Sequence, residues 1–149
     1  MVRVPDVVGW PAGGAPKAPP GFTVSRYAEG LEHPRWLLVL PNGDVTVSEA
    51  TSKPGAPRTV FGHAISATMR RAGALGDSPD RIVLLRDADG DGTAEQRHLF
   101  VEHQSQPFGM ALLGDTFYVG NTDGVMAFSY TPGATRLEGP AQRLTTHPG

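Results

Sequence analysis

Short runs of apolar residues, each ended by a turn signal, recur along the chain from residue 22 to residue 145. Apolar and polar positions alternate in some of these runs, and others are brief continuous apolar stretches bounded by Gly, Pro, Asn or Asp. Both patterns are typical of β-strands. They predict strands at residues 22–27, 36–40, 45–49, 81–86, 97–101, 110–113, 117–119, 125–130 and 142–145, and therefore an all-β fold.

One segment departs from the β pattern. Phe61, Ile65 and Met69 recur every four residues, which is the spacing of one face of an α-helix. Gly73 and Gly76 follow and end the periodic segment. A single short helix is therefore predicted at about residues 64–72, inside an insertion that lies between two predicted strands.

Two stretches of the chain repeat the same order of features. Pro34 and Pro107 each begin a unit that reads proline, apolar strand, Gly/Asp turn, apolar strand, small residue and polar residue. Such a unit is typical of a β-propeller blade, which has four antiparallel strands. The offset of 73 residues between the two prolines exceeds the usual blade length of about 40–45 residues. The helix-bearing insertion accounts for the surplus, so the pattern predicts about two blades.

Two blades do not close a propeller, which usually has about 4–8. An open pair leaves an unpaired strand edge and an exposed apolar flank. Two kinds of partner would cover these surfaces: the remaining blades of a longer chain, or further copies of this chain. Both alternatives stay open at this stage.

Composition narrows the class of protein. The 149 residues include 39% hydrophobic and 19% charged residues, as in soluble globular domains, and the 19 glycines and 14 prolines agree with many turns. The net charge is −2 with no basic stripe, so no nucleic-acid partner is expected. The sequence contains no apolar run long enough for a membrane span and no signal-peptide pattern. Residues 1–20 are predicted to be a Pro/Gly-rich extended segment, and residues 21–149 to be the folded part.

Three groups of motifs together resemble a known family. They are Pro19–Ala28 with Pro34–Trp36, then Arg81–Gly92, then Gln106–Ala111 with Asn121–Gly124. In their order and spacing they resemble the N-terminal portion of sorbosone dehydrogenases, which are related to soluble glucose and aldose sugar dehydrogenases. The likeness spans about residues 19–144.

The resemblance implies a six-bladed β-propeller that binds pyrroloquinoline quinone (PQQ) at its centre. Such oxidoreductases are mostly periplasmic or secreted, and they oxidise a sugar hydroxyl or hydrated aldehyde by hydride transfer to the quinone. A histidine acts as the base, and calcium polarises the quinone as a Lewis acid. In the family the base begins the next blade, after a segment resembling 145–149. No catalytic role is therefore assigned to His147, and this piece alone is expected to be inactive. Two other functions stay open: a non-catalytic binding propeller built from several copies, and a calcium-stabilised extracellular β module.

An acidic turn is the clearest local chemistry in the sequence. Asp87, Asp89 and Asp91 alternate with small residues, and Gly90 and Gly92 allow the backbone to bend so that carboxylates converge. Calcium takes six to eight oxygen ligands, and such a loop supplies several of them. The predicted metal ligands are Asp87, Asp89, Asp91, Thr93 and Glu95. The loop resembles the first half of an EF-hand loop, but position twelve is His98 rather than glutamate. The alternative is an Asp/Gly-rich turn without an ion.

The resemblance also selects candidate cofactor-binding residues. In such a blade, the start of the innermost strand and the end of the second strand face the axial cavity. These positions are Arg35 and Glu49 in the first unit, and Gln106 and Asn121 in the second, with Gln104 as an alternative match to Gln106. The competing interpretation is that Arg35 and Glu49 pair with each other or cap turns. Trp36 begins an apolar strand and is expected in the core.

Overall fold

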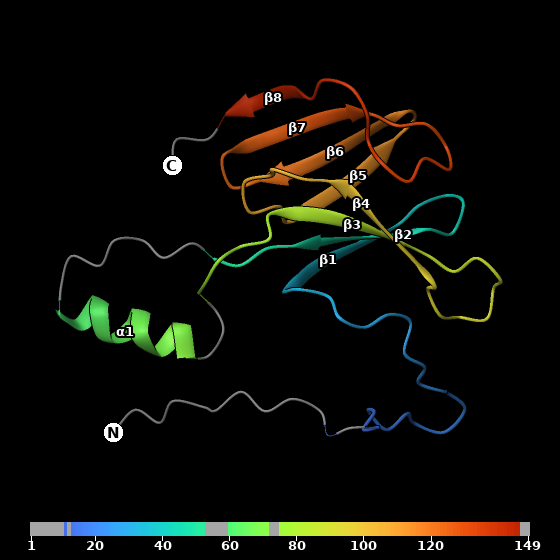
Figure 1. The fold of residues 1–149 in the computed structure, drawn as a ribbon, viewed down its shortest axis with the longest axis horizontal. Helices are drawn as coiled ribbons and strands as arrows, with labels where there is room; N and C mark the ends of the chain where they lie inside the picture. The colour runs from blue at the N-terminus through green and yellow to red at the C-terminus, as the bar shows by residue number, and fades with distance from the viewer. Residues whose placement is uncertain (1–10, 12, 53–59, 72–74, 147–149) are drawn as a thin grey trace.

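The computed structural model describes residues 11, 13–52, 60–71 and 75–146. Within them the chain forms two four-stranded antiparallel sheets and one helix (Figure 1). The first sheet contains β1 (Pro34–Val39), β2 (Val45–Glu49), β3 (Arg81–Arg86) and β4 (Gln96–Val101). The second contains β5 (Gly109–Leu113), β6 (Thr116–Asn121), β7 (Gly124–Ser129) and β8 (Gln142–Thr146). The helix α1 covers Val60–Arg71.

Both sheets are meanders in which each strand pairs with the next strand along the chain. The hairpins β1–β2 and β5–β6, which the sequence repeat relates, occupy the same first position in their respective sheets. A tight turn joins β1 to β2, in which Gly43 adopts a φ of 90° and donates its N–H to the Leu40 carbonyl. Glycine tolerates this left-handed conformation because it has no Cβ.

The main core lies between the two sheets. Ile82, Leu84 and Phe100 of the first sheet meet Phe117 and other side chains of the second sheet. The Phe100 and Phe117 rings pack edge to face with centroids 5.2 Å apart, a geometry that aromatic rings prefer. The second sheet thus covers one face of the first, and Figure 1 shows the two sheets as stacked layers.

A smaller hydrophobic cluster covers the opposite face of the first sheet. Val47, Val83 and Leu85 are buried there beneath the segment 27–31 and Ala94. This explains the continuous apolar sequence of β3, because successive side chains of a strand point to opposite faces and here both faces are covered. The alternating pattern of a half-exposed strand appears instead in β6, where Phe117 and Val119 are buried.

Two sequence predictions of local structure need correction. Residues 22–27 form no strand, although they alternate; the chain there runs as an irregular segment, and the Tyr27 carbonyl accepts a single hydrogen bond from the Ala94 N–H. The helix begins at Val60, four residues before the predicted start, and ends at Arg71. The remaining predicted strands each coincide with an observed strand, within two residues at either end. Of the predicted extended segment at residues 1–20, residues 1–10 and 12 lie outside the described residues, and residues 11 and 13–20 form no helix or strand.

No helix among the described residues is long and apolar enough to cross a membrane.

Candidate functional site

The acidic turn forms a compact group of carboxylates between β3 and β4. One carboxylate oxygen from each of Asp87, Asp89, Asp91 and Glu95 lies within 4.8 Å of the others. Asp87 is half-buried, and the other three are exposed. Four of the five predicted metal ligands are therefore brought together, and this acidic loop could bind a metal ion such as Ca²⁺, which prefers carboxylate oxygens.

Backbone N–H groups hold the acidic loop in this shape. Asp87 accepts hydrogen bonds from Gly90 at 2.7 Å and from Gly92 at 2.9 Å, one on each carboxylate oxygen. Glu95 reaches back to accept the N–H of Ala88 at 2.9 Å. These bonds fix two carboxylates by local backbone contacts, so that the like charges stay close together without any cationic side chain within the loop.

The pKa of Asp87 is lowered, chiefly by the hydrogen bond from the Gly92 N–H and further by that from Gly90. A carboxylate that accepts backbone N–H bonds is stabilised in its charged form. Asp87 is therefore ionised over the whole neutral range, as a calcium ligand must be.

Thr93 is the fifth predicted ligand and lies in the same loop. Its N–H donates to Asp91 Oδ1 at 2.8 Å, and its side chain is exposed. Asp91 in turn donates its N–H to Asp89 Oδ1 at 3.1 Å. Thr93 thus orients the carboxylate of Asp91, and the carboxylates themselves are the four groups that converge.

Glu49 is fully buried, and its carboxylate is bound by the protein itself. Oε2 accepts a hydrogen bond from Arg81 Nε at 2.6 Å, and Oε1 accepts the N–H of Glu32 at 2.6 Å. The pKa of Arg81 is raised, first by this bond to Glu49. The competing interpretation that Glu49 pairs with Arg35 is therefore wrong in its partner, which is Arg81 and faces Glu49 across the β2–β3 pair.

Arg35 lies at the edge of an open hollow of about 510 Å³ beside the first residues of β1. Its guanidinium carbon sits 5.5 Å from the centroid of the Phe108 ring, and its Nη1 donates to the Ala50 carbonyl at 3.5 Å. Trp36 contacts the same phenylalanine and is 48% exposed, so its expected place in the core is wrong. The hollow is lined by His33, Pro34, Arg35, Ala50, Thr51, Ser52 and Phe108.

The other three candidate cofactor residues lie at the same end of the sheets as this hollow, but their side chains form hydrogen bonds within the protein. They are Gln104, Gln106 and Asn121. Gln106 Nε2 donates to the Thr51 carbonyl at 2.7 Å. Asn121 Nδ2 donates to Gln104 Oε1 at 3.0 Å, while Asn121 Oδ1 is buried without a partner among the described residues. The structure thus brings both glutamine alternatives and Asn121 into one polar network across the two sheets.

Asp80 anchors this network, and sequence reasoning missed it. Its Oδ1 accepts the Gln106 N–H at 3.1 Å, and its carbonyl accepts the Gln104 N–H at 2.9 Å. Asp80 and Gln106 both have positive φ values, of 45° and 50°, a region that is uncommon outside glycine and that Asp adopts more readily than most residues. The Ser-Pro-Asp sequence before β3 was the available signal, since such residues favour hydrogen-bonded turns.

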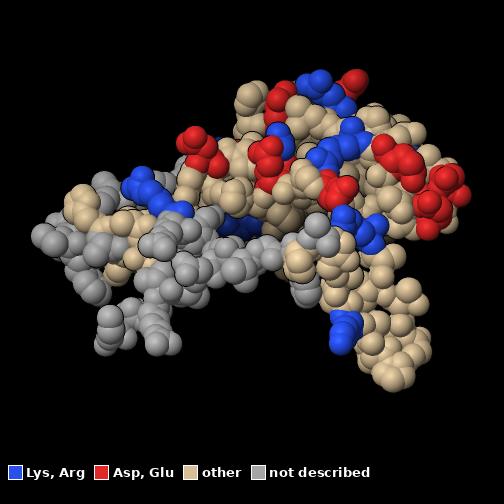
Figure 2. Space-filling view, turned by 60° about the horizontal axis from the view of Figure 1, so that its bottom comes forward, with Lys and Arg blue, Asp and Glu red and all other residues tan. Residues whose placement is uncertain are grey.

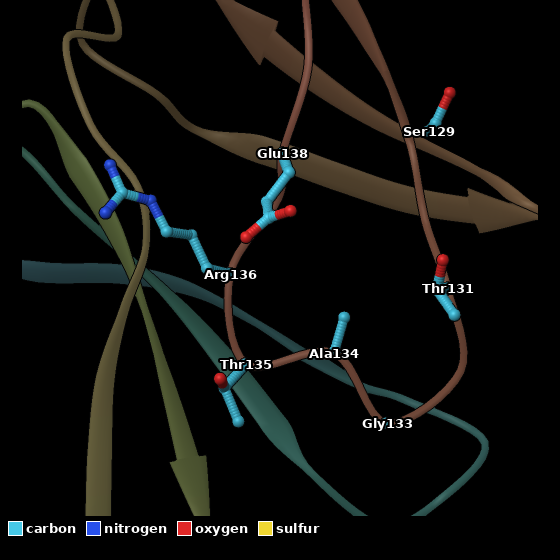
Figure 3. Close-up of a pocket in the computed structure, with 7 residues that line it drawn as sticks. All are labelled: Ser129, Thr131, Gly133, Ala134, Thr135, Arg136 and Glu138. Atoms are coloured by element: carbon cyan, nitrogen blue, oxygen red, sulfur yellow. The ribbon is translucent and has the colours of Figure 1, made fainter.

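A second hollow, of about 440 Å³, lies under the loop between β7 and β8. Figure 3 shows Ser129 and Thr131 on one side of it, with Arg136 directed away from the enclosed space. Arg136 Nη2 lies 3.5 Å from Glu102 Oε1, outside the hollow. The charged side chains of this loop therefore do not converge on a common point.

Comparisons of the chain with known protein families, curated proteins and solved structures found no match in any of the three.

The five candidate cofactor residues are not gathered around one hollow among the described residues. Only Arg35 lines the hollow, whereas Glu49 is buried in its ion pair with Arg81. The amide groups of Gln104, Gln106 and Asn121 are engaged with one another or with the backbone. We therefore derive no step of chemistry through PQQ, and the acidic loop is the better-defined site.

Proposed function

We propose that this chain contributes two consecutive blades of a β-propeller that resembles PQQ-dependent sugar dehydrogenases. The acidic loop binds Ca²⁺ in a structural role in the first blade. By the sequence resemblance, the parent protein would be an oxidoreductase acting on a sugar hydroxyl or hydrated aldehyde, with PQQ as the hydride acceptor and a histidine of a later blade as the base. This chain alone supplies scaffold and calcium site and is inactive.

The equivalence of the two hairpins is the observation that carries the propeller proposal. β1–β2 and β5–β6 begin two four-stranded meanders, and β1 lies beside β5, as the innermost strands of neighbouring blades do. β1 is the edge strand of the first sheet and still exposes Leu37 and Val39 to solvent. Leu113 on β5, the corresponding edge strand, is also exposed. Further blades would cover these apolar side chains.

The calcium proposal rests on the convergence of four carboxylates. The loop supplies them from a span of nine residues, and backbone hydrogen bonds already hold Asp87 and Glu95 in place. Binding to such a prearranged loop avoids part of the ordering entropy that a flexible loop would lose. Because the loop connects β3 to β4, a bound ion would fasten the outer hairpin of the first sheet.

Only the sequence resemblance supports a quinone cofactor and a sugar substrate. The test is dye-coupled oxidation of glucose, other aldoses and sorbosone, after loading with PQQ and Ca²⁺. It compares the 149-residue chain with the product of a reading frame extended beyond Gly149. We expect sugar-dependent dye reduction by the extended protein and none by the chain alone. An extended protein that neither binds the quinone nor oxidises a sugar would contradict the enzymatic proposal.

Assembly from several copies is the second candidate, favoured by the same exposed side chains on β1 and β5. Light scattering after size-exclusion chromatography separates the two. A closed oligomer of uniform mass would support a propeller made of copies of this chain. A monomer would favour blades supplied by a longer chain.

A further inference from the structure

The insertion between β2 and β3 has an electrostatic character opposite to that of the rest of the chain. Residues 51–76 carry four cationic side chains and no Asp or Glu. The whole chain has a net charge of −2, so the residues outside the insertion carry −6. The four cations are Lys53, Arg58, Arg70 and Arg71.

The helix α1 within this insertion exposes apolar side chains. Ile65 and Met69 are one helical turn apart and therefore lie on the same face, and they are 44% and 38% exposed. Arg70 and His63 are exposed and project elsewhere around the helix, since each residue is rotated by about 100° from the previous one. Among its described side chains, α1 thus carries Arg70 on a polar side and exposes Ile65 and Met69 on an apolar side. Figure 1 shows it to one side of the two sheets.

The two ends of the insertion meet at one end of the first sheet. Ser52 and Leu75 form a parallel bridge, and Thr51 Oγ1 donates to the Gly76 carbonyl at 3.2 Å. The acidic loop follows the other end of β3, a six-residue strand about 20 Å long. This separation exceeds the Debye length of about 8 Å at physiological ionic strength, so the acidic loop does not neutralise the helix. In Figure 2 the largest group of acidic side chains lies at the right of the molecule.

We propose that α1 docks on the surface of an anionic phospholipid bilayer. Short helices with basic polar faces and apolar opposite faces lie in the membrane interface, held by apolar burial and by attraction to anionic lipids. Ile65 and Met69 enter the boundary between headgroups and acyl chains, while Arg70 contacts lipid phosphates. The acidic loop lies at the other end of β3 from the insertion, so its charge does not oppose this contact.

The test is flotation of the full 149-residue chain with vesicles at low ionic strength. One vesicle type contains phosphatidylglycerol and phosphatidylcholine, and the other contains phosphatidylcholine alone. We expect binding to the anionic vesicles only, and loss of that binding as salt is raised. Arg70→Gln should weaken binding about fivefold. The double variant Ile65→Ser with Met69→Ser should weaken it about tenfold or more.

Two matched variants control for general charge and hydrophobicity. Leu113→Ser removes a more exposed apolar side chain from β5, and Arg136→Gln removes an exposed arginine from the β7–β8 loop. Both should bind anionic vesicles like the unaltered chain, and circular dichroism checks that every variant keeps its fold. Absence of binding to either vesicle type would overturn the proposal. So would equal binding to both types, or equal losses in the helix variants and the controls.

Discussion

Arg86 holds Asp44 through two parallel hydrogen bonds, from Nε to Oδ1 at 2.7 Å and from Nη2 to Oδ2 at 2.6 Å. The same Nη2 also donates to the Gly133 carbonyl at 3.0 Å, in the loop between β7 and β8. Asp44 is buried and also accepts a hydrogen bond from Asn42 Nδ2 at 2.7 Å. This bidentate ion pair therefore links the turn of the first sheet to a loop of the second.

Removal of one partner from this pair should destabilise the fold. Asp44→Ala leaves Arg86 without its carboxylate, and breaking a buried pair in this way costs about 3 kcal/mol of unfolding free energy. Urea denaturation followed by tryptophan fluorescence measures the change. Glu102→Ala, which removes a half-exposed carboxylate 3.5 Å from Arg136, should cost less than about 1 kcal/mol. Equal losses for the two variants would show that the bidentate pair has no special role.

The pH dependence of stability should follow from the same contact. The pKa of Asp44 is lowered below its ordinary value of 3.8, first by the hydrogen bond from Arg86. A carboxyl with a lowered folded-state pKa stabilises the fold above its unfolded pKa, and this stabilisation is lost as pH falls through the folded pKa. The chain should therefore lose stability as pH drops below about 4. Asp44→Asn should show a shallower loss over that range, and an unchanged pH profile in urea titrations would contradict this assignment.

Glu49 should behave as a structural residue. Glu49→Ala leaves the Arg81 guanidinium and the Glu32 N–H without their shared acceptor, and we expect a loss of about 3 kcal/mol in unfolding free energy. Glu29→Ala is the matched control, because it removes an exposed glutamate paired with Arg26 at 2.7 Å. That control should change stability by less than about 0.5 kcal/mol. A loss as small as that of the control would contradict this structural role.

Gly124 should tolerate no side chain. It has a φ of 146°, and a Cβ there would lie 2.0 Å from the Thr145 carbonyl oxygen. Gly124→Ala should therefore cost about 2 kcal/mol or more, by strain and by separation of β8 from β7. Gly109→Ala, where a Cβ meets nothing within 4 Å, should be neutral or slightly stabilising. Thermal melting of both variants gives the comparison. Similar melting temperatures would show that β8 shifts to accommodate the added methyl group without loss of stability.

The strands could be predicted from sequence where burial follows a local rule. β3 and the two repeated hairpins carry apolar runs that end at turn residues, and the structure places strands there. Residues 22–27 show the limit of the rule. They alternate like a strand, but Tyr27 and Leu31 cover the outer face of the first sheet without joining it as a strand. Periodicity records which side chains are buried and does not identify a hydrogen-bonding neighbour.

The sequence predicted the convergence of the acidic loop but not the side-chain contacts at the polar end of the sheets. The four carboxylates of the acidic loop are close in sequence, so local spacing was sufficient to predict that they converge. Glu49 meets Arg81 across 32 residues, and Gln106 meets Thr51 across 55. Such pairs depend on strand register and loop closure, which the local pattern of a single sequence does not encode.

Calcium titration of the acidic loop is the most direct test of the central claim. Calorimetry of the 149-residue chain should show binding at one site, and saturating Ca²⁺ at about one hundred times Kd should add about 2.7 kcal/mol of stability. Asp89→Asn should abolish both effects, whereas Asp115→Asn, in the exposed turn between β5 and β6, should leave them intact. If calcium gives no binding heat and no rise in melting temperature in the unaltered chain, the proposed calcium site does not exist.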